Sequence, residues 1–220
     1  MNLLIKLIII LIIFYIIKKN EIENFLEYAK EEDEYILPII HENIISEEEA
    51  KYIIENAEII FKDSETVSGL DSNIRKSQTA WLYINDIKIK NIIERICKLT
   101  NMPLENAEAL QIVKYVPGGF YRQHHDSCCD NNKECDEFIK RGGQRSVTMV
   151  IYLNDDFTGG FTNFPIIKQK YKPPKYGGLL FYPLEKKGEK CHPYAMHEGT
   201  DLESGVKYIA NVWIRQSKFV

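Results

Sequence analysis

Residues 115–126 have the sequence Tyr-Val-Pro-Gly-Gly-Phe-Tyr-Arg-Gln-His-His-Asp, and this stretch decides how the rest of the chain is interpreted. A Pro-Gly-Gly turn separates the apolar segment 109–116 from a second extended segment that ends in His124, His125 and Asp126. In an extended backbone, residues i and i+2 point to the same side. We therefore expect His124 and Asp126 to present an imidazole and a carboxylate to one point, while His125 faces away.

A third metal ligand could come from a neighbouring strand further along the chain. His197 stands between the aromatic-rich segment 192–194 and the last long apolar segment. Two histidines and one carboxylate that leave three coordination positions open are typical of non-haem Fe(II) oxygenases. Taken alone, a His-x-Asp pattern more often marks two polar surface residues after a turn, so the context decides.

Lys207 provides that context. It lies ten residues after His197, in a segment (206–214) that is otherwise apolar and predicts a strand. A lysine inside such a strand needs a partner or a wet cavity. A dicarboxylate co-substrate that chelates the metal would place its far carboxylate where Lys207 could pair with it. The alternative is an ordinary lysine on an edge strand.

Elements predicted around these residues place helices before strands. Ser46 followed by three glutamates is a capping box that opens a helix to about Ala57, and apolar spacing predicts a second helix over 86–100. Residues 62–77 predict a loop. Strands are expected at 35–40, 80–84, 109–116, 146–153, 161–164, 178–182 and 206–214. This order predicts helices packed on one face of an antiparallel sandwich or barrel.

Composition narrows the class of protein. The chain has 220 residues, 45% of them hydrophobic, which excludes general disorder. With 28 Lys and Arg against 32 Asp and Glu, the net charge is −4, so a nucleic-acid partner is not expected. Five cysteines do not make a disulfide scaffold, although one or two bridges are possible.

The N-terminus is a separate segment. Residues 1–17 are apolar except for Asn2 and Lys6, and Lys18 and Lys19 follow. The run is short for a membrane span, which typically needs about 20 residues, and no small-residue cleavage site follows it. We favour an uncleaved signal anchor at 1–19 over a cleaved signal peptide or a buried helix, followed by an acidic stalk at 20–34. Positive charge on both sides leaves the membrane orientation open.

From residue 107 to 216 the chain resembles the prolyl 4-hydroxylase branch of the Fe(II)/2-oxoglutarate dioxygenases. The resemblance rests on five ordered motifs and a final Asn-x-Trp. They comprise Tyr115, Gly118, Tyr121, His124 and Asp126; Arg145, Thr148, Val150, Tyr152, Asn154 and Asp155; Gly159, Gly160, Thr162, Phe164 and Pro165; Lys172, Pro173, Gly177 and Phe181; His197, Gly199, Gly205 and Lys207; and Asn211 with Trp213.

The resemblance implies an α+β, mainly β fold, in which N-terminal helices flank a double-stranded β-helix, or jelly roll, within residues 35–220. It implies Fe(II) held by His124, Asp126 and His197, and 2-oxoglutarate bound through Lys207 with Tyr115 and Thr162 as hydrogen-bond partners. O2 would be the second co-substrate and ascorbate the reductant. The expected substrate-groove residues are Tyr121, Arg145 and Trp213.

Residues 127–144 depart from the family pattern and carry Cys128, Cys129 and Cys135. We interpret this segment as a mobile loop over the groove. Its cysteines could form a bridge within it or pair with Cys191. A zinc site is also open, but the spacing matches no usual Cys-x-x-Cys pattern. Cys97 is expected to be a buried apolar residue on the second helix.

The function implied by the resemblance is 4-hydroxylation of peptidyl proline in a proline-rich or collagen-like protein, with release of succinate and CO2. A proline-rich chain is already extended as polyproline II and suits an aromatic groove. The implied setting is a membrane-anchored enzyme of the endoplasmic reticulum or secretory lumen. The alternatives are the same chemistry on lysine, another side chain or a small molecule, and a catalytically silent jelly-roll binding module. The oligomeric state stays open.

Overall fold

The computed structural model describes residues 15, 18–19, 35–65, 69–130, 132–186, 188 and 190–220. The chain divides into two compact units, Met1–Tyr35 and Ile36–Val220, and the second carries the fold described below. The expected anchor and stalk lie outside the described residues, apart from Tyr15, Lys18 and Lys19. Among the residues that are described, no helix has the length and apolar character needed to cross a membrane.

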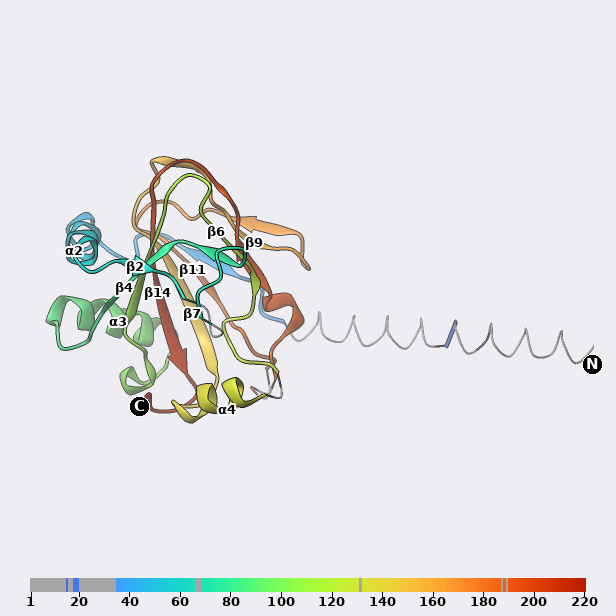
Figure 1. Ribbon diagram of the computed structural model, residues 1–220. Coiled ribbons are helices and arrows are strands. Elements are labelled where there is room, and N and C mark those ends of the chain that lie inside the picture. Colours follow the sequence, from blue (N-terminus) through green and yellow to red (C-terminus); the bar gives the residue numbers. More distant parts are fainter. Residues whose placement is uncertain are drawn as a thin grey trace, which may run out of the picture. The chain divides into compact units, whose positions relative to one another are not determined.

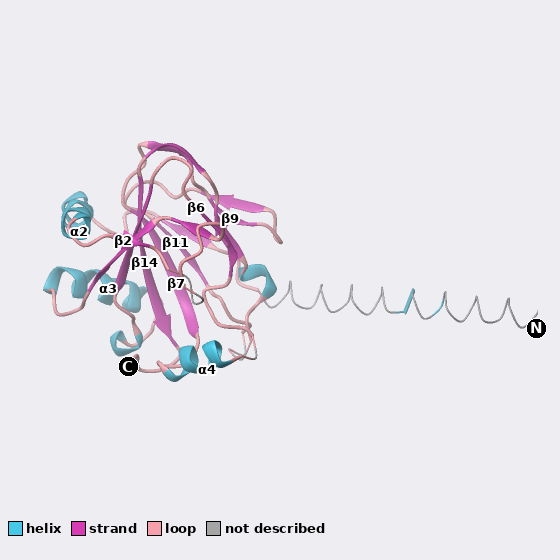
Figure 2. Ribbon diagram, viewed as in Figure 1, coloured by secondary structure: helices cyan, strands magenta, loops and turns pink. Residues whose placement is uncertain are grey.

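Two antiparallel sheets form the body of this unit (Figures 1 and 2). The larger sheet has the order β1 (Ile39–His41), β11 (Gly178–Phe181), β7 (Arg145–Tyr152), β14 (Lys207–Arg215), β5 (Leu110–Tyr115), β4 (Gln78–Leu82) and β2 (Lys62–Asp63). The smaller sheet has the order β10 (Gln169–Tyr171), β9 (Thr162–Phe164), β12 (His197–Gly199), β6 (Phe120–His124) and β3 (Arg75–Lys76). A separate pair joins β8 (Phe157–Gly159) to β13 (Leu202–Gly205).

Helices α2 (Glu47–Glu58) and α3 (Ile87–Leu99) lie against one side of the larger sheet (Figure 2). The capping box expected for α2 is present: the Ser46 hydroxyl accepts from the Glu49 amide, and the Glu49 carboxylate accepts from the Ser46 amide. Asp86 caps α3 by accepting from the amides of Lys88 and Ile89. The fold class expected from the sequence, mainly β with flanking N-terminal helices, is confirmed.

The strict period of two along the central strands creates two separate cores. On β14, Ala210, Val212 and Ile214 belong to the core shared with the helices, whereas Ile209 belongs to the core between the sheets. Strand β7 divides in the same way. Side chains alternate across a strand, so the odd-numbered residues of β14 face the space between the sheets. Lys207 is odd-numbered and therefore faces the space between the sheets.

The structure corrects several details of the sequence interpretation. The expected loop at 62–77 contains the two-residue strands β2 and β3. The expected mobile loop after Asp126 contains helix α4 (Lys133–Lys140), capped by Asn132. Strands β8, β10, β12 and β13 are three or four residues long. Such short strands show too few alternations to be recognised in a sequence.

Candidate active site

His124, Asp126 and His197 lie together, and the pairing of β6 with β12 brings them there. His124 ends β6, His197 begins β12, and the two histidines are direct cross-strand partners. The Nε2 atoms of both lie 3.9 Å from Oδ1 of Asp126. The ligand atoms of the three residues all lie within 4.8 Å of one another. This is the facial arrangement of two imidazoles and one carboxylate that suits Fe(II).

Hydrogen bonds to backbone carbonyls set the tautomer of both histidines. Nδ1 of His124 lies 2.7 Å from the Arg122 carbonyl oxygen, and Nδ1 of His197 lies 3.0 Å from that of Ala195. A carbonyl oxygen only accepts, so Nδ1 carries the hydrogen in each ring and donates it. The lone pair is left on Nε2, the atom that faces the carboxylate. Metal-binding histidines are commonly oriented by such outer hydrogen bonds.

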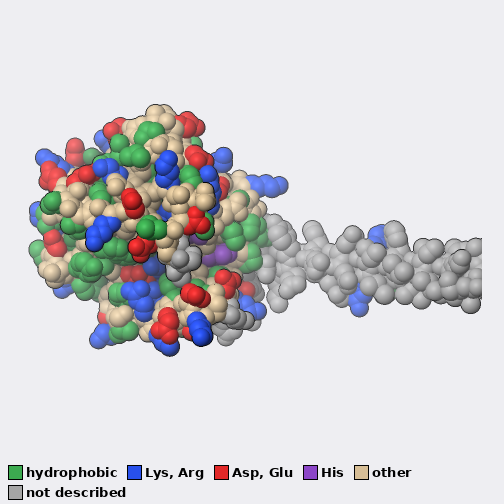
Figure 3. All heavy atoms as spheres, in the orientation of Figure 1, with side chains coloured by type: hydrophobic (Ala, Val, Ile, Leu, Met, Phe, Trp, Pro, Cys, Tyr) green, Lys and Arg blue, Asp and Glu red, His purple; other side chains and the backbone are tan. Residues whose placement is uncertain are grey.

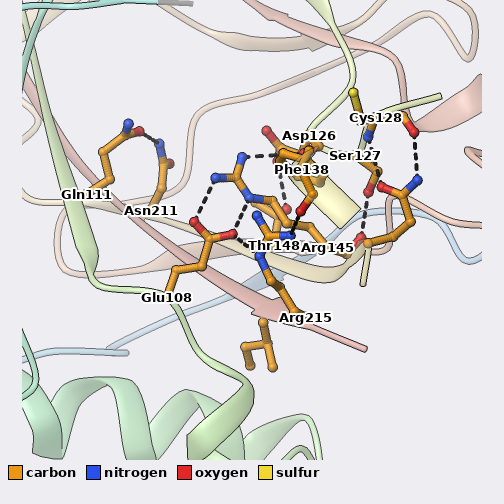
Figure 4. Close-up of polar contacts among 12 residues, drawn as sticks. Glu108, Gln111, Asp126, Ser127, Cys128, Phe138, Arg145, Thr148, Asn211 and Arg215 are labelled. Atoms are coloured by element: carbon orange, nitrogen blue, oxygen red, sulfur yellow. Dashed lines mark hydrogen bonds and ion pairs between the residues drawn. The ribbon is translucent and has the colours of Figure 1, made fainter. Parts of the chain in front are cut away.

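Asp126 is held by the strand behind it. The Thr148 hydroxyl on β7 donates to Oδ2 of Asp126 at 2.7 Å, so Oδ1 is left for the histidine side (Figure 4). Burial is the largest single influence and would raise the pKa of Asp126. The charges of the two histidines and of Arg145, with the Thr148 hydrogen bond, together outweigh it, so the pKa is lowered. Burial, together with His197, places the pKa of His124 well below its ordinary value. The site therefore presents an anionic carboxylate and a neutral His124, the protonation states that metal ligands need.

Aromatic rings line the histidines. Tyr121 stacks on His124 with ring centroids 3.6 Å apart. Phe164 and Phe181 approach His197 with centroids at 5.4 and 4.8 Å. Rings packed this closely leave each imidazole little freedom to rotate, so the donor atoms are preorganised.

Lys207 lies at the other end of the same space and is 2% exposed. Its Nζ donates to the Gly160 carbonyl at 2.6 Å and lies 3.4 Å from the Tyr152 hydroxyl. Within the part of the chain that is described, no carboxylate forms an ion pair with it. Burial, with a smaller contribution from Lys172, lowers the pKa of Lys207 to about 7. A buried ammonium without an acidic partner is a ready site for the carboxylate of a ligand.

The hydroxyl groups around Lys207 include one that the sequence interpretation did not assign to the site. Tyr115 is the cross-strand partner of Lys207, as expected for neighbours. Thr162 is also close, but its hydroxyl is hydrogen-bonded at 2.8 Å to Tyr152, which lies between it and Lys207. The sequence indicates Tyr152 only as a residue of a family motif. Its parity on β7, shared with Thr148 and Val150, was the signal that could have placed it in the cavity.

All nine residues expected in the site line one cavity. They are His124, Asp126, His197, Lys207, Tyr115, Thr162, Tyr121, Arg145 and Trp213. The cavity has a volume of about 1010 Å³. Histidine side chains are visible from outside among acidic and basic side chains on the face that Figure 3 shows. The site is therefore large enough for a small dicarboxylate and part of a peptide.

Arg145 is held more firmly than a groove interpretation suggests (Figure 4). Arg145 donates to both carboxylate oxygens of Glu108, at 2.7 and 2.8 Å, and its guanidinium lies 3.5 Å from the Trp213 ring centroid. Arg215, fully buried, donates to the same carboxylate at 2.8 Å. The sequence interpretation missed Glu108 and Arg215. The signal was one charged residue at one end of each of two paired apolar strands: Glu108 just before β5 and Arg215 at the end of β14.

Two disulfides and a pair of hydrogen bonds fix the cysteine-bearing segment 127–144 in place. Cys128 is bonded to Cys135, and Cys129 to Cys191. The Gln144 side chain accepts from the Cys128 amide at 2.9 Å and donates to its carbonyl at 2.6 Å. Both pairings left open by the sequence are therefore present, and Cys97 is buried as expected. His125 is not part of the group formed by His124 and Asp126; its ring lies with Cys129 and Cys191.

Comparison with known proteins identifies the family. Residues 110–215 match the model of the 2OG-Fe(II) oxygenase superfamily. A protein of Acanthamoeba polyphaga mimivirus, provisionally named a prolyl 4-hydroxylase, is 47% identical over 87% of this chain and 79% of its own length. Prolyl 4-hydroxylase 1 of Arabidopsis thaliana is 30% identical over 81% of this chain and 68% of its own. The chain belongs to the prolyl 4-hydroxylase family of 2-oxoglutarate-dependent dioxygenases.

Solved structures of prolyl hydroxylases have the same fold. A viral collagen prolyl hydroxylase from Paramecium bursaria Chlorella virus-1, solved with 2-oxoglutarate, is 27% identical over 80% of this chain and 94% of its own, with a TM-score of 0.61. A Trichoplax adhaerens prolyl hydroxylase in complex with a peptide of hypoxia-inducible factor has a TM-score of 0.60 at 17% identity over 91% and 92% of the two chains. The second likeness concerns the fold alone.

Membership in the family implies Fe(II), 2-oxoglutarate and O2, and the residues present suit them. Two imidazole nitrogens and a carboxylate oxygen converge at one end of the cavity, which is the donor set of non-haem iron. A buried ammonium without an acidic partner among the described residues lies at the other end, which suits a distal carboxylate. The chain is thus a 2-oxoglutarate-dependent dioxygenase of the prolyl hydroxylase kind.

Proposed function

We propose that this enzyme hydroxylates peptidyl proline at C4 in a proline-rich or collagen-like protein, with release of succinate and CO2. The observation that carries the proposal is that one cavity contains both a metal-ligand cluster and a buried lysine. The cluster consists of His124, Asp126 and His197, and the lysine is Lys207. Bound Fe(II) would supply the activation of O2 and the oxidation of the substrate C–H bond. The relatives named above carry prolyl hydroxylase names, which supports proline as the target.

The residues expected to bind iron and 2-oxoglutarate each have a task in this proposal. His124, Asp126 and His197 hold the iron, and the bonds from Nδ1 and from Thr148 aim their donor atoms. Lys207 pairs with the distal carboxylate of 2-oxoglutarate, with Tyr152, Tyr115 and Thr162 as the surrounding hydroxyl groups. These groups orient the keto acid before substrate arrives, so that little reorganisation is needed during the reaction.

The peptide would lie along the open part of the cavity. Tyr121, Trp213 and Trp81 line it, and Trp81 lies 6.1 Å from Trp213 between ring centroids. Flat aromatic faces suit the pyrrolidine rings of a polyproline II chain, which has no internal hydrogen bonds. Because Arg145 is bound to Glu108, we assign it to holding the Trp213 face in place as well as to the groove. Ascorbate is the proposed reductant that restores Fe(II).

We place the enzyme in an oxidising compartment, the endoplasmic reticulum or secretory lumen, anchored to the membrane by residues 1–19 through the stalk at 20–34. Two disulfides near the active site support an oxidising setting, because disulfides are rare in reducing compartments. The apolar sequence of residues 1–17 supports the anchor.

The decisive experiment measures succinate and peptide mass together. The enzyme is incubated with Fe(II), 2-oxoglutarate, ascorbate and either a proline-rich peptide, its 4-hydroxyproline counterpart or a matched peptide with lysine in place of proline. We expect succinate in step with the gain of one oxygen atom on the proline peptide only. Oxygen added to the lysine peptide instead would move the target to another side chain. Absence of succinate in all reactions would contradict the proposal and support a catalytically silent binding module.

A further inference from the structure

His125, Cys129 and Cys191 form a second group of ligand atoms, separate from the His124, Asp126 and His197 cluster. One ring nitrogen and the two sulfurs all lie within 4.8 Å of one another. His125 directly follows β6, Cys129 lies in the segment after Asp126, and Cys191 lies in the segment before His197. The proposed reaction assigns no task to them.

His125 is not satisfied by hydrogen bonding in this group. Its Nδ1 is buried, and among the described residues it has no hydrogen-bond partner. A buried polar nitrogen without a partner is uncommon in proteins and calls for an explanation such as a bound ion. His125 is the first residue after β6, and although it also lines the cavity, its ring lies beside the two cysteines and outside the cluster of His124.

The disulfide that closes this group is open to chemistry from outside. Cys129 is exposed and Cys191 is half-buried, so a thiol reductant can reach the bond. The two α-carbons lie 5.6 Å apart. Two thiolates on one tetrahedral zinc are about 3.8 Å apart, since each Zn–S bond is about 2.3 Å. Rotation of the two side chains therefore suffices to convert the bonded pair into a pair of metal ligands.

We propose that His125, Cys129 and Cys191 bind a thiophilic divalent cation, Zn²⁺, when the Cys129–Cys191 disulfide is reduced. Two thiolates and one imidazole, with water in the fourth position, are an established zinc donor set. Soft sulfur ligands separate this site from the oxygen- and nitrogen-rich iron site next to it.

Reduction of the disulfide comes first, and binding of the metal follows. A dithiol reductant gives two electrons and two protons to the Cys129–Cys191 bond and becomes a disulfide itself. The two protein thiols then release their protons to solvent as Zn²⁺ binds. Two Zn–S bonds and one Zn–N bond form, and the oxidation state of zinc does not change.

The consequence concerns the iron site. Cys129 follows Asp126 by three residues, and Cys191 precedes His197 by six. A disulfide joins these two segments under oxidising conditions, and a zinc ion joins them under reducing conditions. The segments that carry two of the proposed iron ligands are thus cross-linked in both environments.

Cobalt is the probe that tests the site, because thiolate-to-Co²⁺ charge transfer gives near-ultraviolet absorption that histidine and carboxylate ligands do not. The full chain is reduced without oxygen, freed of reductant and titrated with Co²⁺. We expect one equivalent of thiolate-bound Co²⁺, bleached by added Zn²⁺, and none in the oxidised protein. Reduced protein without the band would overturn the proposal.

Three variants locate the ligands. His125→Ala keeps the disulfide for folding and should weaken Co²⁺ binding in the reduced state by at least about tenfold, since even loss of a residue that only orients a ligand typically costs about 10- to 100-fold in metal affinity. Cys191→Ser should lose the band. Cys135→Ser removes a neighbouring thiol that is outside the group and should keep the band. A band that survives in both His125→Ala and Cys191→Ser, or that depends equally on Cys135, would place the metal elsewhere and refute the proposal.

Discussion

Single atoms decide what the metal cluster can bind. The hydrogen of each ligand imidazole is on Nδ1 because a carbonyl oxygen lies 2.7 or 3.0 Å away. Lone pairs on Nε2 of His124 and His197 and the free oxygen of Asp126 then meet at one point. A neighbouring histidine, His125, shares the tripeptide but not the cluster. Substitution at these positions should therefore separate neighbours that sequence alone does not distinguish.

For the iron ligands, we expect His124→Ala, Asp126→Ala and His197→Ala each to abolish turnover and to weaken Fe(II) binding, because one of three ligands is lost. His125→Ala should keep most of its turnover in the oxidised enzyme. Isothermal titration with Fe(II) under argon and succinate formation are the two measurements. An inactive His125→Ala beside an active His124→Ala would show that the strand register is wrong.

For Lys207, a neutral substitution should raise the KM for 2-oxoglutarate far more than it changes iron affinity. A buried carboxylate left without its partner costs about 3–5 kcal/mol, roughly a 10²- to 10³-fold loss or more. Lys207→Met keeps the apolar stem and is the variant to measure, beside an iron titration as control. An unchanged KM would assign the carboxylate to another residue.

The pKa of Lys207 adds a pH dependence whose sign follows from its direction. Burial lowers that pKa to about 7, so the amine is neutral above pH 7 in the free enzyme. Binding a carboxylate there requires uptake of a proton, and the Kd for 2-oxoglutarate should rise by about tenfold per pH unit above about 7. Calorimetry in buffers of different ionisation enthalpy would detect the proton. Lys207→Arg, permanently charged, should show none.

At the scale of elements, the strands supply the ligands and the connections hold them. Asp126 follows β6 and is oriented by Thr148 of β7, while the segment after it is joined by a disulfide to the segment before β12. Glu108 joins β7 and β14 through Arg145 and Arg215 (Figure 4). These links are made between elements far apart in the sequence, so their loss should be felt at the site.

The two disulfides should differ in their contribution to stability. Cys129–Cys191 closes a loop of 62 residues and Cys128–Cys135 a loop of 7. Chain entropy then predicts about 4 kcal/mol for the first and about 2 kcal/mol for the second. Urea unfolding of the two double-alanine variants, with a chelator present and no reductant, measures both. Equal losses would mean that native packing, and not loop length, dominates.

Arg145 and Trp213 make an element-scale test of the peptide groove. Arg145→Ala leaves the buried Glu108 paired with Arg215 alone and should cost about 1.5–3 kcal/mol, the usual range for a lost hydrogen bond to a charged group. Trp213→Phe keeps most of the packing and should keep the melting temperature within a few degrees. We expect Trp213→Phe to impair peptide hydroxylation while uncoupled 2-oxoglutarate decarboxylation continues. Loss of both activities with unchanged folding would assign Trp213 to the co-substrate side of the cavity.

At the scale of the whole molecule, every site residue lies in the unit Ile36–Val220. Deletion of residues 1–34 should therefore leave a folded enzyme with its turnover intact. The full chain, but not the truncated one, should partition into detergent if residues 1–19 form an anchor. Circular dichroism, succinate formation and phase partition are the three measurements. Loss of folding on truncation would show that the N-terminal run belongs to the core.

The sequence by itself determined those features that depend on neighbours along the chain. The capping box of α2, the stripe of α3 and the alternation of the long strands β5, β7 and β14 arise from local periodicity, so they were predictable. The His-x-Asp pattern already put two side chains on one face. The ten-residue spacing from His197 to Lys207 could also be recognised in the sequence, because both residues belong to one continuous stretch near the C-terminus.

Only the tertiary structure decided which partners meet across strands. The pairing of His124 with His197, the place of Tyr152 between Lys207 and Thr162, and the sharing of Glu108 by Arg145 and Arg215 all depend on register between distant strands. The choice among cysteine pairings is of the same kind, since it depends on which segments the two sheets bring close. Periodicity describes the face of one strand, whereas contact between faces is set by the packing of the whole sheet.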